Sequence, residues 1–164
     1  MTPELFAEFV EKVRQYLEDL SNTNPAVIAA CKSGEDFEVC VRDAAAAVLA
    51  REGIQAEIQY EQGSHVFPDV VLVFANGEKY GIEVKSSTST SSKNWKINGN
   101  SVLGSTKEDV VDTYIIFGKP LSVTKDSGAS GTKMPLRMSP LHTAPDTPLI
   151  WRSQATKPSL QSLA

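Results

Sequence analysis

The sequence lacks the features that would place the protein in or across a membrane. It contains no apolar run of roughly eighteen residues, so we expect no membrane-spanning helix. It opens MTPELFAEFVEKV, without the basic and apolar stretches of a secretory signal. Its only two cysteines, Cys31 and Cys40, match neither a disulfide framework nor a zinc-binding motif. We therefore expect a cytoplasmic protein in which both thiols are small buried apolar side chains.

A chain of this length is expected to form one domain with its own hydrophobic core. It has 164 residues, of which 41% are hydrophobic and 22% charged, values typical of a globular protein. No internal repeat is visible. We divide the single domain, 1–164, into an N-terminal helical segment (1–32), a core of about 33–118 and an irregular C-terminal part (119–164). The tail from Lys157 is a candidate for disorder.

Acidic and basic residues are distributed unevenly along the chain, whose net charge is -4. Residues 1–84 hold six Lys/Arg and fifteen Asp/Glu, a net of -9. Residues 85–164 hold ten Lys/Arg and five Asp/Glu, a net of +5. Such asymmetry indicates an anionic partner for the second half, unless the acidic excess is only the solvated face of helices.

Two long helices are expected before the first strand. In residues 3–19, with Thr2 as N-cap and Pro3 in the first turn, apolar residues recur at helical spacing. The sequence Asn22-Thr23-Asn24-Pro25 breaks this pattern, and residues 26–31 are a candidate for a short helix. The second long helix is predicted over 35–52. Ser33 would cap it, Asp36 nearly completes a capping box, and Gly53 would end it.

Strands are expected from the middle of the chain onward. Residues 54–61 alternate between apolar and polar, residues 66–74 are rich in β-branched side chains, and residues 80–85 form a return strand after Asn76-Gly77. A further buried strand is predicted at 113–117. Beyond residue 120 we expect loops with one or two short strands. This order of elements predicts the α/β (α+β) class.

Three charged residues stand out on the predicted hairpin. Asp69 opens its first strand, and alternation places Glu83 and Lys85 on one face of the second. The opposite face is apolar and is expected to pack on a helix. Because the Asp69 face continues with apolar Val71 and Val73, we expect the sheet to be covered on both sides, with Glu83 and Lys85 partly buried.

The length of the hairpin loop decides whether these residues meet. A two-residue Asn76-Gly77 loop would put Asp69 opposite Val84, on the wrong face. A three-residue loop is expected to put Asp69 opposite Lys85 and on the face of Glu83, and a bulge would act similarly. A functional site here therefore predicts an odd-length loop or a bulge.

Two neighbouring carboxylates repel each other, and a divalent cation relieves that repulsion. Few, hard oxygen ligands suit Mg²⁺, with Mn²⁺ as a substitute. The Lys85 ammonium beside them would hold an attacking water, as hydrolysis of a phosphodiester requires. The alternative is an ordinary hairpin with a Lys–Glu ion pair at its open end.

Pro68-Asp69, a gap of thirteen residues, and Glu83-Val84-Lys85 together resemble the motif of the PD-(D/E)XK nuclease superfamily. The segment Gly34-Glu35-Asp36-Phe37-Glu38 is similar to the Gly-x-x-Phe-Glu helix opening of several restriction-type nucleases. The resemblance covers about residues 33–118. It implies a restriction-endonuclease-like core, with a central mixed β-sheet flanked by helices.

The resemblance also implies a role for each residue of the site. Asp69 and Glu83 would bind the catalytic Mg²⁺, with the backbone carbonyl of Val84 as a further ligand. Lys85 would position the attacking water and stabilise the developing charge. Glu38 would hold the metal through water or bind a second metal ion, and Glu35 is the weaker candidate. Otherwise Glu38 is a solvated helix residue.

The activity implied is metal-dependent hydrolysis of double-stranded DNA, with a type II restriction endonuclease, acting as a homodimer, as the first choice. The expected DNA contacts come from the end of the return strand and the loop after it: Ser86, Lys93, Asn94, Lys96, Asn98 and Asn100. Such enzymes are usually longer, and residues 119–164 are short for a recognition element. A repair or recombination nuclease such as a junction resolvase, and a non-catalytic DNA-binding module on the same fold, remain alternatives.

Overall fold

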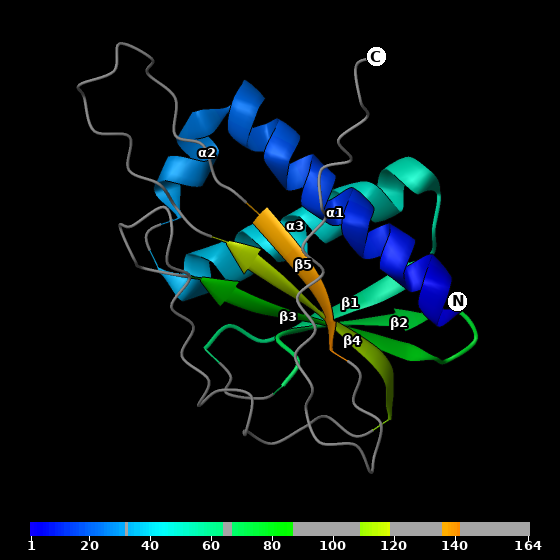
Figure 1. Cartoon of the computed structure of the whole chain (residues 1–164). Helices are drawn as coiled ribbons and strands as arrows, with labels where there is room; N and C mark the ends of the chain where they lie inside the picture. Colours follow the sequence, from blue (N-terminus) through cyan, green and yellow to red (C-terminus); the bar gives the residue numbers. More distant parts are fainter. Residues whose placement is uncertain (32, 64–66, 87–108, 119–135, 142–164) are drawn as a thin grey trace, which may run out of the picture.

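A five-stranded mixed sheet forms the centre of the computed structural model, which describes residues 1–31, 33–63, 67–86, 109–118 and 136–141 (Figure 1). The strands are β1 (Ala56–Tyr60), β2 (Val70–Phe74), β3 (Lys79–Ser86), β4 (Val110–Gly118) and β5 (Leu136–Leu141). They lie side by side in the order β1-β2-β3-β4-β5. β3 and β4 are parallel, and the other neighbouring pairs are antiparallel. The predicted class, a mixed sheet combined with helices, is confirmed.

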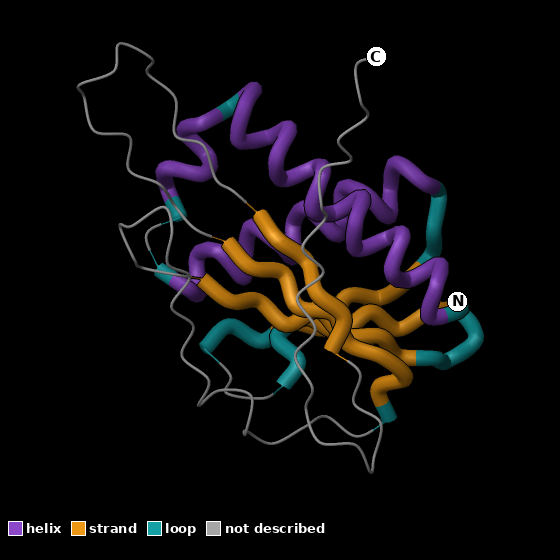
Figure 2. The backbone as a smooth tube through the Cα atoms, viewed as in Figure 1, coloured by secondary structure: helices purple, strands orange, loops and turns teal. Residues whose placement is uncertain are grey.

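The described helices cover one face of this sheet (Figure 2). They are α1 (Pro3–Thr23), α2 (Pro25–Ala30) and α3 (Gly34–Glu52). Apolar side chains of α1 and α3 pack in one core with a single face of β2, β3 and β4, and the sheet residues of that core are Val70, Leu72, Phe74, Tyr80, Ile82, Val84, Tyr114 and Ile116. Cover on both faces was expected, but no helix in the described part of the chain packs on the second face. Its residues Val71, Ile115 and Phe117 are nevertheless buried.

The first helix is longer than its sequence predicts. The Thr2 hydroxyl caps it by accepting the N–H of Leu5 at 3.3 Å, as expected. Its end is at Thr23 rather than residue 19, and the N–H of Asn24 closes the last turn by donating to the Leu20 carbonyl at 2.8 Å. Pro25 ends the helix, since the residue before a proline disfavours helical geometry.

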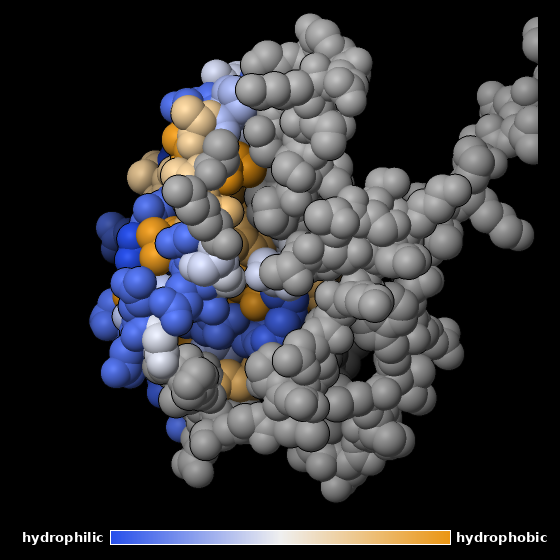
Figure 3. Space-filling model, turned by 90° about the vertical axis from the view of Figure 1, so that its left-hand side faces the viewer, coloured by the Kyte–Doolittle hydropathy of each residue, from blue (hydrophilic) through white to orange (hydrophobic). Residues whose placement is uncertain are grey.

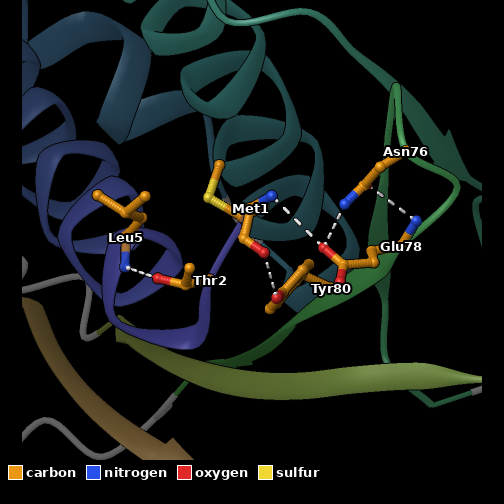
Figure 4. Close-up of polar contacts among 6 residues, drawn as sticks. All are labelled: Met1, Thr2, Leu5, Asn76, Glu78 and Tyr80. Atoms are coloured by element: carbon orange, nitrogen blue, oxygen red, sulfur yellow. Dashed lines mark hydrogen bonds and ion pairs between the residues drawn. The ribbon is translucent and has the colours of Figure 1, made fainter.

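Met1, which precedes α1, makes polar contacts with residues next to the β2–β3 turn (Figure 4). The terminal ammonium of Met1 contacts Glu78 Oε2 at 3.4 Å, and the hydroxyl of Tyr80 donates to the Met1 carbonyl at 2.9 Å. Asn76 Nδ2 also donates to Glu78 Oε2, at 2.6 Å. This polar cluster lies at the turn end of the hairpin, away from the end that carries Asp69.

The second long helix follows its predicted boundaries closely. Ser33 Oγ accepts the N–H of Asp36 at 3.1 Å, and the Asp36 carboxylate accepts the N–H of Ser33 at 2.9 Å, which completes the capping box. Gly53 ends the helix in the left-handed conformation, with φ 66°. The short helix expected at 26–31 is α2. The cap matters because it fixes the first turns of α3, which carry Glu38.

Both cysteines are free thiols. Cys31 is buried, as expected, whereas Cys40 in α3 is half-buried rather than fully buried. Burial and, next, the neighbouring Cys31 raise the pKa of Cys40 to about 12. The Cys40 thiol is therefore protonated and unreactive near neutral pH.

The strand expected at 66–74 begins only at Val70. Proline has no N–H for the ladder, and Pro68 follows Phe67 through a cis peptide bond. The strand expected at 54–61 is likewise shorter, 56–60. β5 is one of the short strands expected beyond residue 120. The irregular remainder of 119–164 and the loop at 93–100 lie outside the described residues.

The β2–β3 hairpin turns through three residues, which confirms the predicted odd-length loop. Phe74 N–H donates to the Glu78 carbonyl at 2.9 Å, and Gly77 N–H donates to the Phe74 carbonyl at 2.8 Å. Gly77 has φ 81°, a conformation that glycine adopts without strain. Because Val70 pairs with Ile82, the next residue back, Asp69, lies opposite Glu83. The expected pairing of Asp69 with Lys85 was wrong, because the three loop residues are 75–77, whereas pairing with Lys85 requires a loop of 76–78.

Candidate active site

The predicted site lies where β2 begins and β3 ends. β2 pairs with β3 only from Val73 to Val70, whose partner is Ile82. Beyond that pair, β3 continues to Ser86 with β4 on its other side. The first turn of α3 is close by, since a methyl group on Gly34 would lie 3.4 Å from Ser86 Oγ. This end of β3 therefore has room for side chains from β2 and α3 to approach it.

Asp69 and Glu83 contact one another directly at this end. The backbone N–H of Asp69 donates to Glu83 Oε2 at 3.3 Å. The Asp69 carboxylate in turn accepts the backbone N–H of Val84 through Oδ2 at 2.7 Å. The two residues are thus fixed by backbone groups of each other's strands. Val84 contributes this N–H to the site. The role of its backbone carbonyl as a metal ligand stays a prediction.

Lys85 lies on the same face as Glu83, as alternation predicts. Its ammonium forms an ion pair with Glu83 Oε1. The two side chains are only 14% and 2% exposed, respectively. Removing two charges from water is costly, and the pairing offsets part of that cost. Buried charges of this kind in a strand interior indicate a functional site more often than ordinary surface ion pairs do.

Glu83 is buried beside a second carboxylate, and both features change its pKa. Burial is the largest effect that raises the pKa of Glu83, followed by the charge of Asp69. The ion pair with Lys85 lowers the pKa, but the net result is a value of about 7. A cation bound beside Glu83 would therefore favour the charged form of this carboxyl.

Glu38 faces the same region from α3. Its carboxyl is half-buried, and burial is the main cause that raises its pKa. The charges of Asp69 and Glu35 raise the pKa further, whereas Lys85 lowers it. These interactions place Glu38 near Asp69 and Lys85, and its half-buried position excludes a fully solvated helix residue. Its role toward a metal stays a prediction, as does that of Glu35.

The residues present fit a Mg²⁺ site that uses few protein ligands. Within the described ranges, no three or more His, Cys, Asp or Glu side chains form a cluster that would enclose an ion. Mg²⁺, however, is usually held by one or two carboxylates and completes its shell with waters and substrate phosphates. Asp69 and Glu83 supply such a pair, and an outer contact of Glu38 through water stays a prediction.

Two residues near the site were not singled out from the sequence. The first is Gly81, which lies two residues before Glu83 in β3 and on the same face of the sheet. Neighbouring atoms approach it closely, since a methyl group there would lie 2.4 Å from Pro68 Cγ and 2.8 Å from Thr113 Oγ1. A glycine inside a predicted strand is a signal of close approach that would have found it. The second is Tyr60, at the end of β1, whose position depends on tertiary contacts that no local pattern encodes.

Ser86 is the only predicted DNA-contacting residue in the described part of the chain, where it ends β3 beside α3. Lys93, Asn94, Lys96, Asn98 and Asn100 lie outside the described residues. Figure 3 views the molecule from the side toward which β3 and β4 point in Figure 1, and the described surface there is largely hydrophilic, with smaller apolar areas.

No protein-family model matches the sequence, and no curated protein matches it either. No described helix has the length and apolar character needed to cross a membrane.

Proposed function

We propose that the protein is a Mg²⁺-dependent endonuclease that hydrolyses phosphodiester bonds in DNA. The observation that carries the proposal is the grouping of three charged residues at the end of the hairpin: the Glu83 carboxylate accepts the backbone N–H of Asp69 and is ion-paired with the Lys85 ammonium. When bound, Mg²⁺ would supply the positive charge that neutralises the phosphate. Asp69 and Glu83 would hold it, with Glu38 on the outer side.

Each side chain contributes to the reaction in a distinct way. Hydrolysis forms a bond from a water oxygen to phosphorus and breaks the bond to one sugar oxygen, which receives a proton. Lys85 is ion-paired with Glu83 and therefore acts as a hydrogen-bond donor. It would orient the attacking water and stabilise the charge that develops on the phosphate oxygens. The burial of Glu83 and Lys85 excludes bulk water and strengthens these interactions.

Within nucleases, we propose a PD-(D/E)XK core of the type II restriction endonuclease kind, acting on double-stranded DNA as a cytoplasmic homodimer. The described structure supports this. The motif resemblance implies a central mixed sheet with helices, and α3 is followed by the antiparallel strands β1, β2 and β3 and then by β4, which is parallel to β3. A junction resolvase would use the same residues on branched DNA.

The proposal is tested by incubating the purified full chain with supercoiled plasmid in Mg²⁺ and, in parallel, in EDTA. We expect nicked and then linear DNA in Mg²⁺ alone, with discrete fragments if cleavage is sequence-specific. A four-way junction included beside linear duplex separates the two classes, since preferential cutting of the junction indicates a resolvase. Intact plasmid under every metal condition would reject the nuclease proposal and leave a DNA-binding module on this fold.

A further inference from the structure

Tyr60 has an unusual environment for a tyrosine at the end of an edge strand. It is the last residue of β1, and its Cα partner is Val70, the residue after Asp69. Its hydroxyl oxygen is buried and makes no hydrogen bond of ordinary geometry among the described residues. A buried hydroxyl without a partner costs stability, so its retention calls for an explanation.

The ring and the hydroxyl of Tyr60 are both directed to α3. The Arg42 guanidinium lies over the ring, 5.2 Å from its centroid. Glu38 is four residues earlier on α3 and hence on the same side of the helix. The Tyr60 hydroxyl is close enough to act as a hydrogen-bond donor that lowers the pKa of Glu38. In return, burial first and the charge of Glu38 next raise the pKa of Tyr60.

The surrounding residues leave Glu38 the best acceptor for this hydroxyl. Arg42 is a donor, and it already hydrogen-bonds Asp43 at 2.6 Å. Asp69 has its Oδ2 bound to the N–H of Val84 at 2.7 Å. Glu38 is thus the neighbouring side chain to which the Tyr60 hydroxyl can donate.

We propose that Tyr60 is a positioning residue that donates a hydrogen bond to Glu38 and thereby fixes the Glu38 carboxylate at the candidate metal site. This inference rests on the proposed function, in which Glu38 supports the metal from α3. Arg42 holds the tyrosine ring, so that the hydroxyl is presented in one direction. Partners that orient metal-binding groups from outside typically change metal affinity by ten- to a hundredfold when they are removed.

The test compares the full chain with Tyr60→Phe, Glu38→Ala and the double variant. Phenylalanine keeps the ring beneath Arg42, so the fold is expected to persist. Mn²⁺ binding is measured by titration calorimetry without DNA, and thermal unfolding is measured in EDTA. We expect Tyr60→Phe to weaken Mn²⁺ binding about tenfold and the double variant to bind no more weakly than Glu38→Ala alone. The two substitutions should also lower Tm non-additively.

Tyr80→Phe is the matched control, because it removes a hydroxyl that donates to the Met1 carbonyl at the turn end of the hairpin (Figure 4). It should leave Mn²⁺ affinity unchanged. The inference is overturned if Tyr60→Phe binds Mn²⁺ as the wild type does, or loses as much affinity in the Glu38→Ala background. If the wild type neither binds Mn²⁺ nor nicks DNA, the proposed function fails on its own. The unfolding measurements then decide the Tyr60–Glu38 bond: additive Tm shifts overturn it, and non-additive shifts support it.

Discussion

Asp69 and Glu83 are linked through bonds from backbone N–H groups to their carboxylates: the N–H of Asp69 donates to Glu83 Oε2 at 3.3 Å, while Asp69 Oδ2 accepts the N–H of Val84 at 2.7 Å. These bonds keep two carboxyl groups close together in a place where only 2% of the Glu83 side chain is exposed. Burial and the charge of Asp69 both disfavour the charged form of Glu83 and raise its pKa.

Removing the charge of Asp69 should make Glu83 more acidic. The Asp69 carboxylate raises the pKa of Glu83, second only to burial. Asn at position 69 keeps an oxygen that accepts the Val84 N–H, so the register should persist. We expect Asp69→Asn to lower the pKa of Glu83 from about 7, as followed by carbon NMR titration of the side-chain carboxyl. An unchanged titration would show that the two carboxyls do not interact.

Stability should depend on pH through Glu83. Its folded pKa of about 7 lies above the ordinary value of 4.5, so between these pH values the folded protein holds a proton that the unfolded chain releases. The contribution of Glu83 to stability is therefore greatest at low pH and is lost as pH rises through about 7. Denaturant unfolding in EDTA at several pH values should show a steeper decline for the wild type than for Glu83→Gln. If stability declines equally with pH in the wild type and in Glu83→Gln, the pKa of Glu83 is not raised in the folded protein.

Metal binding should show the opposite pH dependence. A carboxylate binds Mg²⁺ only when deprotonated, so the affinity should rise as pH increases through about 7, the pKa of Glu83. Titration calorimetry at pH 6 and 8 measures this. A control variant, Glu57→Gln, changes an exposed carboxylate on β1 and should bind as the wild type does. Equal affinity at both pH values would exclude Glu83 as a ligand.

Gly81→Ala should damage the site without touching a charged residue. The added methyl group would lie 2.4 Å from Pro68 Cγ, and Pro68 directly precedes Asp69. We expect a loss of about 1–3 kcal/mol in the free energy of unfolding and a reduced cleavage rate. Gly34→Ala is the control for stability, because its nearest neighbour would be Ser86 Oγ at 3.4 Å, an ordinary contact. Equal stability of the two variants would show that β3 does not need glycine at 81.

The cap of α3 should influence the site, whereas the cap of α1 should not. Ser33→Ala removes the capping box of the helix that carries Glu38, and Thr2→Ala removes the cap of α1. Each is expected to cost about 1 kcal/mol of stability. Only Ser33→Ala should also weaken Mg²⁺ binding, since fraying of α3 displaces Glu38. Identical metal affinities in the two variants would remove Glu38 from the metal site.

The sequence predicted the elements with strong local signals and missed details set by tertiary contacts. Caps, glycine stops and alternation located α3 and the hairpin, because these are effects of neighbouring residues. The end of α1 was placed too early, because Asn22 and Thr23 continue the helix and only the constraint of Pro25 on the preceding residue stops it. Glu83 and Lys85 were found because charges interrupt an apolar strand. The pairing of Asp69 with Glu83 depended on one loop register, and Tyr60 depended on the packing of β1 against α3.

The rate of plasmid nicking in Mg²⁺ tests directly whether Asp69 and Lys85 belong to the active site. It is measured for four proteins at equal folded concentration: the wild type, Asp69→Asn, Lys85→Ala and the control Glu57→Gln. We predict that the first two substitutions reduce the rate at least about a hundredfold, since each removes a group that acts on the phosphate or the attacking water. Glu57→Gln should cut as the wild type does. Cleavage by Asp69→Asn and Lys85→Ala at the wild-type rate would contradict the proposal that these residues form the active site.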